Sequence, residues 1–190
     1  RWTITYNGEL YNTDDLRRRL KGPRWRGHSD TEVLIEYIAC HGVVAALEAA
    51  RGMFAFGCWD ARERELWLAR DRFGEKPLYY GLHQGAFLFA SELKALRSVP
   101  GFSPEIDRHA LREYFRWTNV PSPMTIYEGV SKLPPAHFLR VGDPAGIPEP
   151  QPYWSALEVA GDAPPMPKGA DAVDCLSDVL DRAVHSQMVS

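Results

Sequence analysis

Met53-Phe54-Ala55-Phe56-Gly57-Cys58-Trp59 is a stretch in which both alternating sets of side chains are apolar. A strand with one face in water alternates apolar and polar residues, so this stretch predicts a strand over residues 53–59 that is covered on both faces. A polar turn over residues 60–65 and a second strand over residues 66–69 follow it. The pair predicts the centre of a layered fold.

Further strands and helices surround this pair. Apolar runs predict a strand over residues 2–6, a hairpin of residues 78–82 and 86–90, and a strand over residues 136–141 that ends at Gly142-Asp143-Pro144. Short helices are expected over residues 92–97 and from Asp107 to about Phe115. Hairpins bounded by helices, without regular strand-helix-strand alternation, indicate an α+β fold with largely antiparallel sheets.

Two more helices are expected between the first strand and residue 53. Asn12 or Thr13 is placed to cap a short helix that carries Leu16 and Leu20. Ser29 and Glu32 have the spacing of a capping box, in which each side chain accepts from the other residue's amide. The helix that follows has an apolar stripe and can end at Gly42; the stripe consists of Leu34, Ile35 and Ile38.

Composition excludes several classes of function. The 190 residues carry a formal charge of −3, so the basic excess typical of nucleic-acid or anionic-membrane binding is missing. No apolar run approaches the roughly 20 residues of a membrane span, and the first residues do not form a signal peptide, so a cytoplasmic protein is expected. Cys40, Cys58 and Cys175 suggest neither a disulfide framework nor a zinc site, and buried reduced thiols are expected.

The chain is expected to be a piece of a longer protein. It opens on a strand without an initiator methionine, and seven of its 15 prolines lie between residues 144 and 167. We therefore expect a domain over residues 1–143, a Pro-rich linker over 144–170 and the start of a second domain over 171–190. Residues 171–189 form an amphipathic helix whose apolar face has no partner downstream; the face consists of Val173, Leu176, Leu180, Val184 and Met188.

Asn7-Gly8-Glu9 has two interpretations. Asn-Gly is typical of a two-residue hairpin turn of type I′, which is the favoured interpretation of the pair alone. In chemical terms, a side-chain amide next to a glycine N–H offers two donors for the oxyanion of an acyl transfer. Glu9 could meet a cationic group, although a glutamate at a strand end is usually only solvated.

Asp30 and residues 70–80 also have two interpretations each. Asp30 lies in the first turn of a helix, where the helix dipole favours a carboxylate, and His28 beside it is an ordinary surface residue or a group that titrates near neutrality. Residues 70–80, Arg-Asp-Arg-Phe-Gly-Glu-Lys-Pro-Leu-Tyr-Tyr, are a solvated loop or a fixed, ion-paired loop or contact surface. The sequence contains no complete catalytic constellation.

Five motifs, in this order, resemble the glutaminase domain of glutamine-hydrolysing asparagine synthetases. They are YNGELYN at residues 6–12, GHSDTE at 27–32, RGMFAF at 51–56, RDRFGEKPLYY at 70–80 and ASELKAL at 90–96. VPSP at residues 120–123 and KLPPAHF at 132–138 resemble the segment that leads out of that domain. The resemblance is weakest from about residue 143 to residue 170.

The resemblance implies a fold and a set of site residues. The fold is the N-terminal-nucleophile fold, an αββα sandwich. Asn7 and Gly8 would form the oxyanion hole, and Glu9 and Asp30 would help to hold the amino acid end of glutamine; no metal site is implied in this part of the protein. The helix over residues 171–190 would begin an ATP-dependent synthetase domain.

The chain departs from the family at both ends. The family's nucleophile is a cysteine at the mature N-terminus, which the chain lacks and which its own cysteines cannot replace, so the fragment is expected to be inactive. The upstream arginine that would bind the glutamine carboxylate is also absent, as is the Ser-Gly-Gly-type loop that binds ATP. Cofactors are therefore expected only in the missing synthetase domain, as ATP and Mg²⁺.

The resemblance implies the following activity and partners. Glutamine hydrolysis would release ammonia, and the synthetase domain would use ATP to convert aspartate to asparagine through an aspartyl-adenylate. The expected partners are glutamine and the missing synthetase domain, and a homodimer is compatible with the sequence. One alternative is an amidotransferase of the same type that acts on another carboxylate, such as a sugar acid or a β-lactam precursor. The other is a degenerate glutamine-binding or scaffold module.

Overall fold

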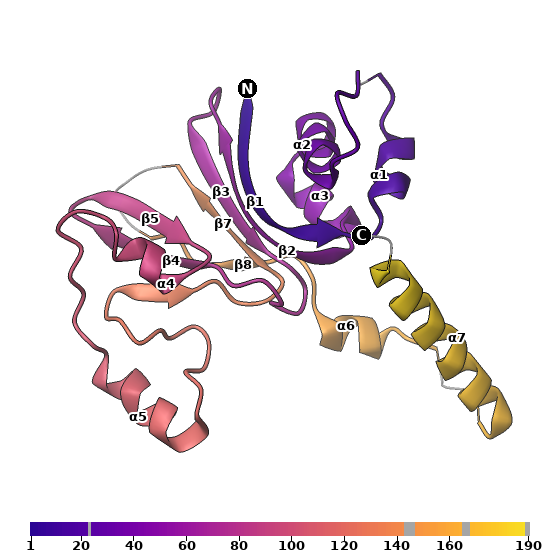
Figure 1. Cartoon of the computed structure of the whole chain (residues 1–190). Coiled ribbons are helices and arrows are strands. Elements are labelled where there is room, and N and C mark those ends of the chain that lie inside the picture. Colours follow the sequence, from indigo (N-terminus) through magenta and orange to yellow (C-terminus); the bar gives the residue numbers. More distant parts are fainter. Residues whose placement is uncertain (23, 143–146, 165–167, 189–190) are drawn as a thin grey trace.

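The structure, a computed structural model, describes residues 1–22, 24–142, 147–164 and 168–188. Two antiparallel sheets pack face to face, and helices cover the outer face of the larger one (Figure 1). The α+β prediction is confirmed. No described helix is long and apolar enough to cross a membrane.

The larger sheet has five strands in the order β1-β2-β3-β7-β8. They are β1 (Trp2–Leu10), β2 (Gly52–Asp60), β3 (Glu65–Arg70), β7 (His137–Val141) and β8 (Gln151–Pro152). Tyr6 pairs with Phe56 across β1 and β2, and Leu68 pairs with Leu139 across β3 and β7. The sheet thus extends past residue 143, because β8 pairs with β7.

Three helices cover one face of this sheet: α1 (Thr13–Arg19), α2 (Asp30–His41) and α3 (Val43–Ala49). Leu16 and Leu34 from the helices and Phe54 and Phe56 from β2 are buried together with Cys58 in the core between these layers. Alternate residues of β2 thus pack on the helices, which is why the segment has no polar face.

The second sheet covers the other face and has three strands in the order β5-β4-β6. Its strands are β4 (Tyr79–His83), β5 (Ala86–Ala90) and β6 (Val130–Lys132). Ala55, Leu68, Tyr80 and Leu139 are buried between the two sheets. A Cβ at Gly57 would lie 2.5 Å from the Phe89 ring, so this glycine lets the second sheet approach β2 closely.

The remaining helices lie outside these layers. The short helix α4 (Leu93–Leu96) packs against β5. Helix α5 (Arg108–Trp117) begins where the Asp107 carboxylate accepts from two amides, as predicted, and runs slightly past the expected end. Helices α6 (Ala156–Gly161) and α7 (Ala170–Gln187) follow β8 along the chain, and most of α7 extends away from both sheets (Figure 1). Parts of the expected linker, residues 144–146 and 165–167, and residues 189 and 190 lie outside the described residues.

The expected hairpin turn at Asn7-Gly8 is wrong. Strand β1 runs without a break from Trp2 to Leu10, and Gly8 pairs with Phe54 inside it. Nine residues of pairing with β2, together with burial of the Leu10 side chain, outweigh the local preference of Asn-Gly for a turn.

Two helix caps differ from the expectation. Neither Asn12 nor Thr13 caps α1 with its side chain: the Thr13 hydroxyl donates to the Leu10 carbonyl at 2.8 Å. The Asn12 amide instead donates to the Ala49 carbonyl at 3.0 Å and accepts from the Arg51 amide at 2.9 Å. Asn12 therefore joins the end of β1 to the turn between α3 and β2.

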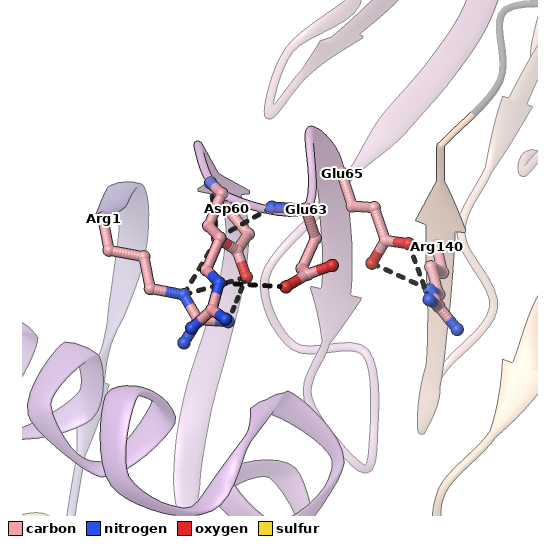
Figure 2. A network of polar contacts seen from close by, with 6 residues as sticks. Arg1, Asp60, Glu63, Glu65 and Arg140 are labelled. Carbon is pink, nitrogen blue, oxygen red and sulfur yellow. Dashed lines mark hydrogen bonds and ion pairs between the residues drawn. The ribbon is translucent and has the colours of Figure 1, made fainter.

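Two ion pairs lie at one end of the larger sheet, the end that is far from Gly8 along β1 (Figure 2). Arg1 donates to both oxygens of the buried Asp60 carboxylate, at 2.7 to 3.2 Å. Arg140 on β7 donates to both oxygens of Glu65 on β3. The Arg1 guanidinium lowers the pKa of Asp60 from 3.8 to about 2, with help from the amides of Arg62 and Glu63.

Candidate functional site

The open edge of β1 is the first component of the candidate site. β1 borders only β2 in its sheet. At the two ends of this pair, the Ala61 amide donates to the Arg1 carbonyl and the Tyr11 amide donates to the Arg51 carbonyl. Hydrogen-bonded pairs alternate along an antiparallel ladder, so even-numbered amides of β1 point to the open edge. The Gly8 amide is therefore a donor that faces away from the sheet.

Gly8 is required by the close approach of β1 to β2. A Cβ at this position would lie 2.2 Å from the Met53 carbonyl oxygen and 2.6 Å from the Phe54 Cα. Any side chain would push the two strands apart. Only glycine fits at this point of the strand pair.

Asp30 lies at the same edge. Its Oδ2 accepts from the Leu10 amide at 3.1 Å and from the Tyr6 hydroxyl at 2.9 Å, and its Oδ1 accepts from the Thr31 amide at 2.6 Å. The cap of α2 is Ser29, whose hydroxyl accepts from the same Thr31 amide at 3.2 Å. Asp30 therefore does more than cap its helix, because it joins the first turn of α2 to β1.

The loop before α2 is held by Glu32, but not as a capping box. The Glu32 carboxylate accepts from the amides of Arg26 and Gly27, at 2.7 and 2.9 Å, and these bonds lower its pKa. The expected bond to Ser29 is not formed, because the loop folds back over the first turn of α2 and brings its own amides to Glu32. His28, in this loop, lines the same cavity as Asp30.

A cavity of about 820 Å³ lies along this edge, and Gly8, Glu9, His28 and Asp30 line it. Other charged residues that line it are Asp14, Asp15, Arg51 and, from the last turns of α7, Arg182. The cavity thus offers both acidic and basic groups, which suits a zwitterion. Among the described residues, the Glu9 carboxylate has no ion-pair partner within the chain, so it is available to a ligand.

Asn7 lies next to this cavity but does not line it. Side chains alternate along a strand, so Asn7 and Glu9 share the face of β1 that is turned from the helices. Asn7 lines a smaller cavity of about 130 Å³, together with Phe89 and Ser91 from the second sheet and its exit. Of the four predicted site residues, the structure brings Gly8, Glu9 and Asp30 to one cavity and places Asn7 at its neighbour.

The loop after β3 supports this edge from behind, and the sequence did not single out its central residue. The Asp71 carboxylate is 1% exposed and accepts from four backbone amides: those of Phe54, Phe73, Glu75 and Lys76, at 3.0 to 3.3 Å. Because Phe54 is the pairing partner of Gly8, Asp71 fixes the backbone directly behind the open edge.

Arg70 complements Asp71 in the same loop. Its guanidinium donates to the carbonyls of Gly74, Lys76 and Leu133, at 2.6 to 2.8 Å. The loop is therefore fixed, as one of the two interpretations had it, but the two charges bind the backbone and not each other. In the sequence, the alternation Arg-Asp-Arg before Gly74 and Pro77 is the feature that could have indicated a fixed loop.

The cysteines do not contribute to the cavity. Cys58 is fully buried, and burial raises the pKa of its thiol to about 12. Cys40 and Cys175 are exposed, against the expectation that all three would be buried. Cys40 ends up outside because the apolar face of α2 is formed by Val33, Leu34, Tyr37 and Ile38. Among the described residues, no group of three His, Cys, Asp or Glu side chains could hold a metal ion.

A family model of the glutamine amidotransferase domain matches residues 1–154 of this chain. The chain belongs to this family. Both sheets, the Gly8 edge and the Asp71 loop lie within the matched part, which we call the amidotransferase domain.

Individual relatives match over the same part. The chain is 42% identical over 145 residues to glutamine-hydrolyzing asparagine synthetase 3 of Bacillus subtilis, which covers 73% of this chain and 23% of the relative. It is 38% identical over 149 residues to the amidase chry2 of Gibberella zeae, covering 78% of this chain and 21% of the relative. The chain thus spans less than a quarter of the length of these relatives.

Solved structures share the fold. The glutamine phosphoribosylpyrophosphate amidotransferase from B. subtilis, complexed with ADP and GMP, aligns with a TM-score of 0.57 at 23% identity. The alignment covers 80% of this chain and 29% of that one. The amidotransferase domain therefore has the N-terminal-nucleophile fold that the sequence predicts.

Proposed function

We propose that this chain is the glutamine-binding part of a glutamine-hydrolysing asparagine synthetase. The longer protein would release ammonia from glutamine here and use it, in an ATP-dependent synthetase domain, to amidate aspartate. The likeness to the B. subtilis synthetase supports this proposal. The observation that carries it is the open edge of β1, where the outward amide of Gly8 lies beside the carboxylates of Glu9 and Asp30.

The charges of the cavity suit the amino acid end of glutamine. An α-ammonium group needs carboxylate acceptors, which Glu9 and Asp30 would supply. Both are half-buried, so each ion pair would be stronger than one at a fully exposed surface. The α-carboxylate would need a cation, and the family resemblance assigns this role to an arginine upstream of residue 1.

The Gly8 amide and the Asn7 side chain would stabilise the transition state. When a thiolate attacks the side-chain amide carbon of glutamine, the carbonyl oxygen becomes negative. One donor directed at such an oxyanion contributes roughly a factor of 100 to 1,000 in rate. Ammonia would then leave, and water would release glutamate from the thioester. We propose that the thiol belongs to a cysteine that precedes Arg1 in the longer protein, with its own α-amino group as the base.

ATP and Mg²⁺ would bind to the synthetase domain. The sequence contains no Gly-rich phosphate loop, and helix α7 would be the first helix of that domain. On this proposal the amidotransferase domain supplies ammonia and takes no part in the chemistry of ATP.

The test replaces Asp30 in the full-length protein that contains this chain. Asp30→Ala should lower kcat/KM for glutamine, measured as glutamate release, by about 100-fold, because a half-buried charge contact to the ammonium is lost. Synthesis from free ammonia should stay within about twofold of the wild type, since ammonia bypasses the glutamine site.

Ser29→Ala is the matched control. It removes the cap of the same helix, at a cost of about 1 kcal/mol of stability, but leaves the carboxylate in place. Glutamine kinetics should hardly change in this variant. If Asp30→Ala leaves kcat/KM for glutamine unchanged, or if both variants lower it equally, Asp30 only shapes the helix start and the proposed site is wrong.

A second candidate keeps the glutamine site and changes the acceptor. The likeness to an amidase favours it, because relatives of the domain are not all asparagine synthetases. The full-length protein would then release glutamate but amidate another carboxylate, such as a sugar acid. Comparing aspartate with other carboxylates as acceptors, by the ATP consumed, separates the two candidates. A protein that releases no glutamate at all would be a glutamine-binding or scaffold module.

A further inference from the structure

The Tyr6 hydroxyl is the only side-chain donor from β1 to Asp30 among the described residues. Tyr6 lies two positions before Gly8, and its ring packs against the core between the larger sheet and the helices. Its hydroxyl donates to Asp30 Oδ2 at 2.9 Å. In the sequence Tyr6 opens the first motif, YNGELYN, and ends an ordinary strand pattern, and neither feature gives it a role of its own.

The Asp30 carboxylate is held on both sides. Oδ2 accepts from two donors of β1, the Tyr6 hydroxyl and the Leu10 amide, which lie on either side of Gly8 along the strand. Oδ1 accepts from the Thr31 amide at 2.6 Å and, at the long distance of 3.3 Å, from the Thr31 hydroxyl. A carboxylate has about four acceptor positions, so one position on Oδ1 is only weakly used.

We propose that Tyr6 is a positioning residue for glutamine recognition: its hydroxyl fixes the Asp30 carboxylate so that the weakly used position on Oδ1 is presented to the α-ammonium group. This inference rests on the proposed function. Without the hydroxyl, Oδ2 keeps only the Leu10 amide at 3.1 Å, and the carboxylate is held less firmly, by that bond and by the Thr31 amide on Oδ1. The ammonium would then have to order the carboxylate as it binds, which lowers affinity.

The surroundings of Tyr6 suit a permanent donor. Burial and the neighbouring Asp30 carboxylate raise the pKa of Tyr6 far above its ordinary value, so the protonated, donating form of the hydroxyl is favoured. A phenylalanine would fill the same space in the core but could not donate. Tyr6→Phe therefore removes the hydrogen bond to Asp30 and leaves the packing of the ring in place.

The same hydrogen bond could also oppose glutamine binding. The hydroxyl could occupy the place of the ammonium while glutamine is absent, and binding would have to displace it. Removal of the hydroxyl would then tighten binding. The two cases predict changes of opposite sign in KM.

The experiment measures glutamate release by the full-length protein that contains this chain. Tyr6→Phe should raise KM for glutamine by about tenfold, the effect of one hydrogen bond to a charged group, while kcat stays within about twofold. Tyr37→Phe is the control, since it removes a hydroxyl from the same core without touching Asp30. Synthesis from free ammonia shows that each variant is folded.

A second measurement asks whether the effect passes through Asp30. Glutaramate, which is glutamine without the α-amino group, should bind equally well to the wild type and to Tyr6→Phe when measured as a competitive inhibitor. In an Asp30→Asn background, Tyr6→Phe should cause no further rise in KM, because the residue that it positions is already altered.

The outcomes separate the two proposals. A KM that is unchanged or lower in Tyr6→Phe overturns the inference, as does a fall in kcat with KM unchanged. A further loss in the double variant, or an equal loss of glutaramate binding, shows a role that does not pass through Asp30 and overturns it too. If the wild type releases no glutamate, the proposed function fails, and this inference fails with it.

Discussion

At the scale of single residues, Asp30, Asp60 and Asp71 have the same side chain but different surroundings. Asp60 meets a guanidinium, Asp71 meets four backbone amides, and Asp30 is held by three close donors and one distant one at the edge of a cavity. Only Asp30 has an acceptor position left for a ligand. The role of each carboxylate is therefore decided by which donors the fold brings to it.

The Asp60 pair predicts a dependence of stability on pH. Its pKa is about 2 in the folded chain, below the ordinary 3.8, so the charged form stabilises the fold above pH 3.8. This contribution should fall as the pH drops below 3.8 and vanish near pH 2. Arg1→Ala should lower the free energy of unfolding at pH 7, and the difference from the wild type should shrink towards pH 2.

Urea unfolding of the chain at pH 7, 4 and 2.5 measures this difference. Arg140→Ala is the control, since it breaks the neighbouring pair with Glu65, in which the arginine is largely exposed. We expect the control to cost less than Arg1→Ala at pH 7. A constant difference between Arg1→Ala and the wild type across the three pH values would contradict the assigned role of Asp60.

At the scale of an element, residues 70–76 form a loop that is held by its own charged side chains. The Asp71 carboxylate accepts from amides of the loop, and the Arg70 guanidinium donates to carbonyls of the loop. The Tyr153 hydroxyl donates to the Arg70 carbonyl at 2.9 Å. Trp154 adds contacts with Arg72 and Phe73. The end of the amidotransferase domain is thereby fastened to the loop that lies behind Gly8.

Asp71→Ala should destabilise the chain by at least about 3 kcal/mol, because four amides lose their acceptor. Asp71→Asn keeps one acceptor oxygen and should cost less, about 1 to 3 kcal/mol. Urea unfolding at pH 7 provides both values. Glu75→Gln, at an exposed position of the same loop, should stay within about 0.5 kcal/mol of the wild type. Equal stability of Asp71→Ala and Glu75→Gln would show that the Asp71 bonds do not hold the loop.

At the scale of the whole molecule, most of α7 extends away from the two packed sheets, and only its last turns, with Arg182, Ala183 and Ser186, border the cavity (Figure 1). Its apolar residues Val173, Leu176, Leu180 and Val184 are between 53% and 67% exposed. A helix of 18 residues whose apolar face is not packed against a core is marginal in water. Our proposal assigns this face to the synthetase domain of the longer protein.

Amide hydrogen exchange of the 190-residue chain tests this view of α7. At low protein concentration, residues 172–188 should exchange at least about 100-fold faster than residues 53–59, since their opening does not require unfolding of a core. Protection of α7 that rises with protein concentration would indicate that another copy covers it. Strong and equal protection of both segments at low concentration would contradict the prediction.

The sequence by itself determined the fold class and most elements of this protein. The two apolar sets of residues 53–59, the apolar spacing of α2 and the Asp107 cap are local patterns, and local patterns report periodicity and burial. The motif resemblance led to the fold and to the family. The local turn prediction was wrong at Asn7-Gly8, because pairing with a strand more than 40 residues away overrides a local turn preference.

Only the tertiary structure decided how the candidate site is arranged and what holds its residues in place. It showed that β1 is an edge strand, that the Gly8 amide points outward, and that Asp30 is held by donors 20 and 24 residues away in the chain. It also showed that Asp71, one of several charged loop residues in the sequence, accepts a hydrogen bond from the Phe54 amide. Edges, directions of amides and partners of buried charges depend on which distant segments meet, and no local pattern of residues encodes that.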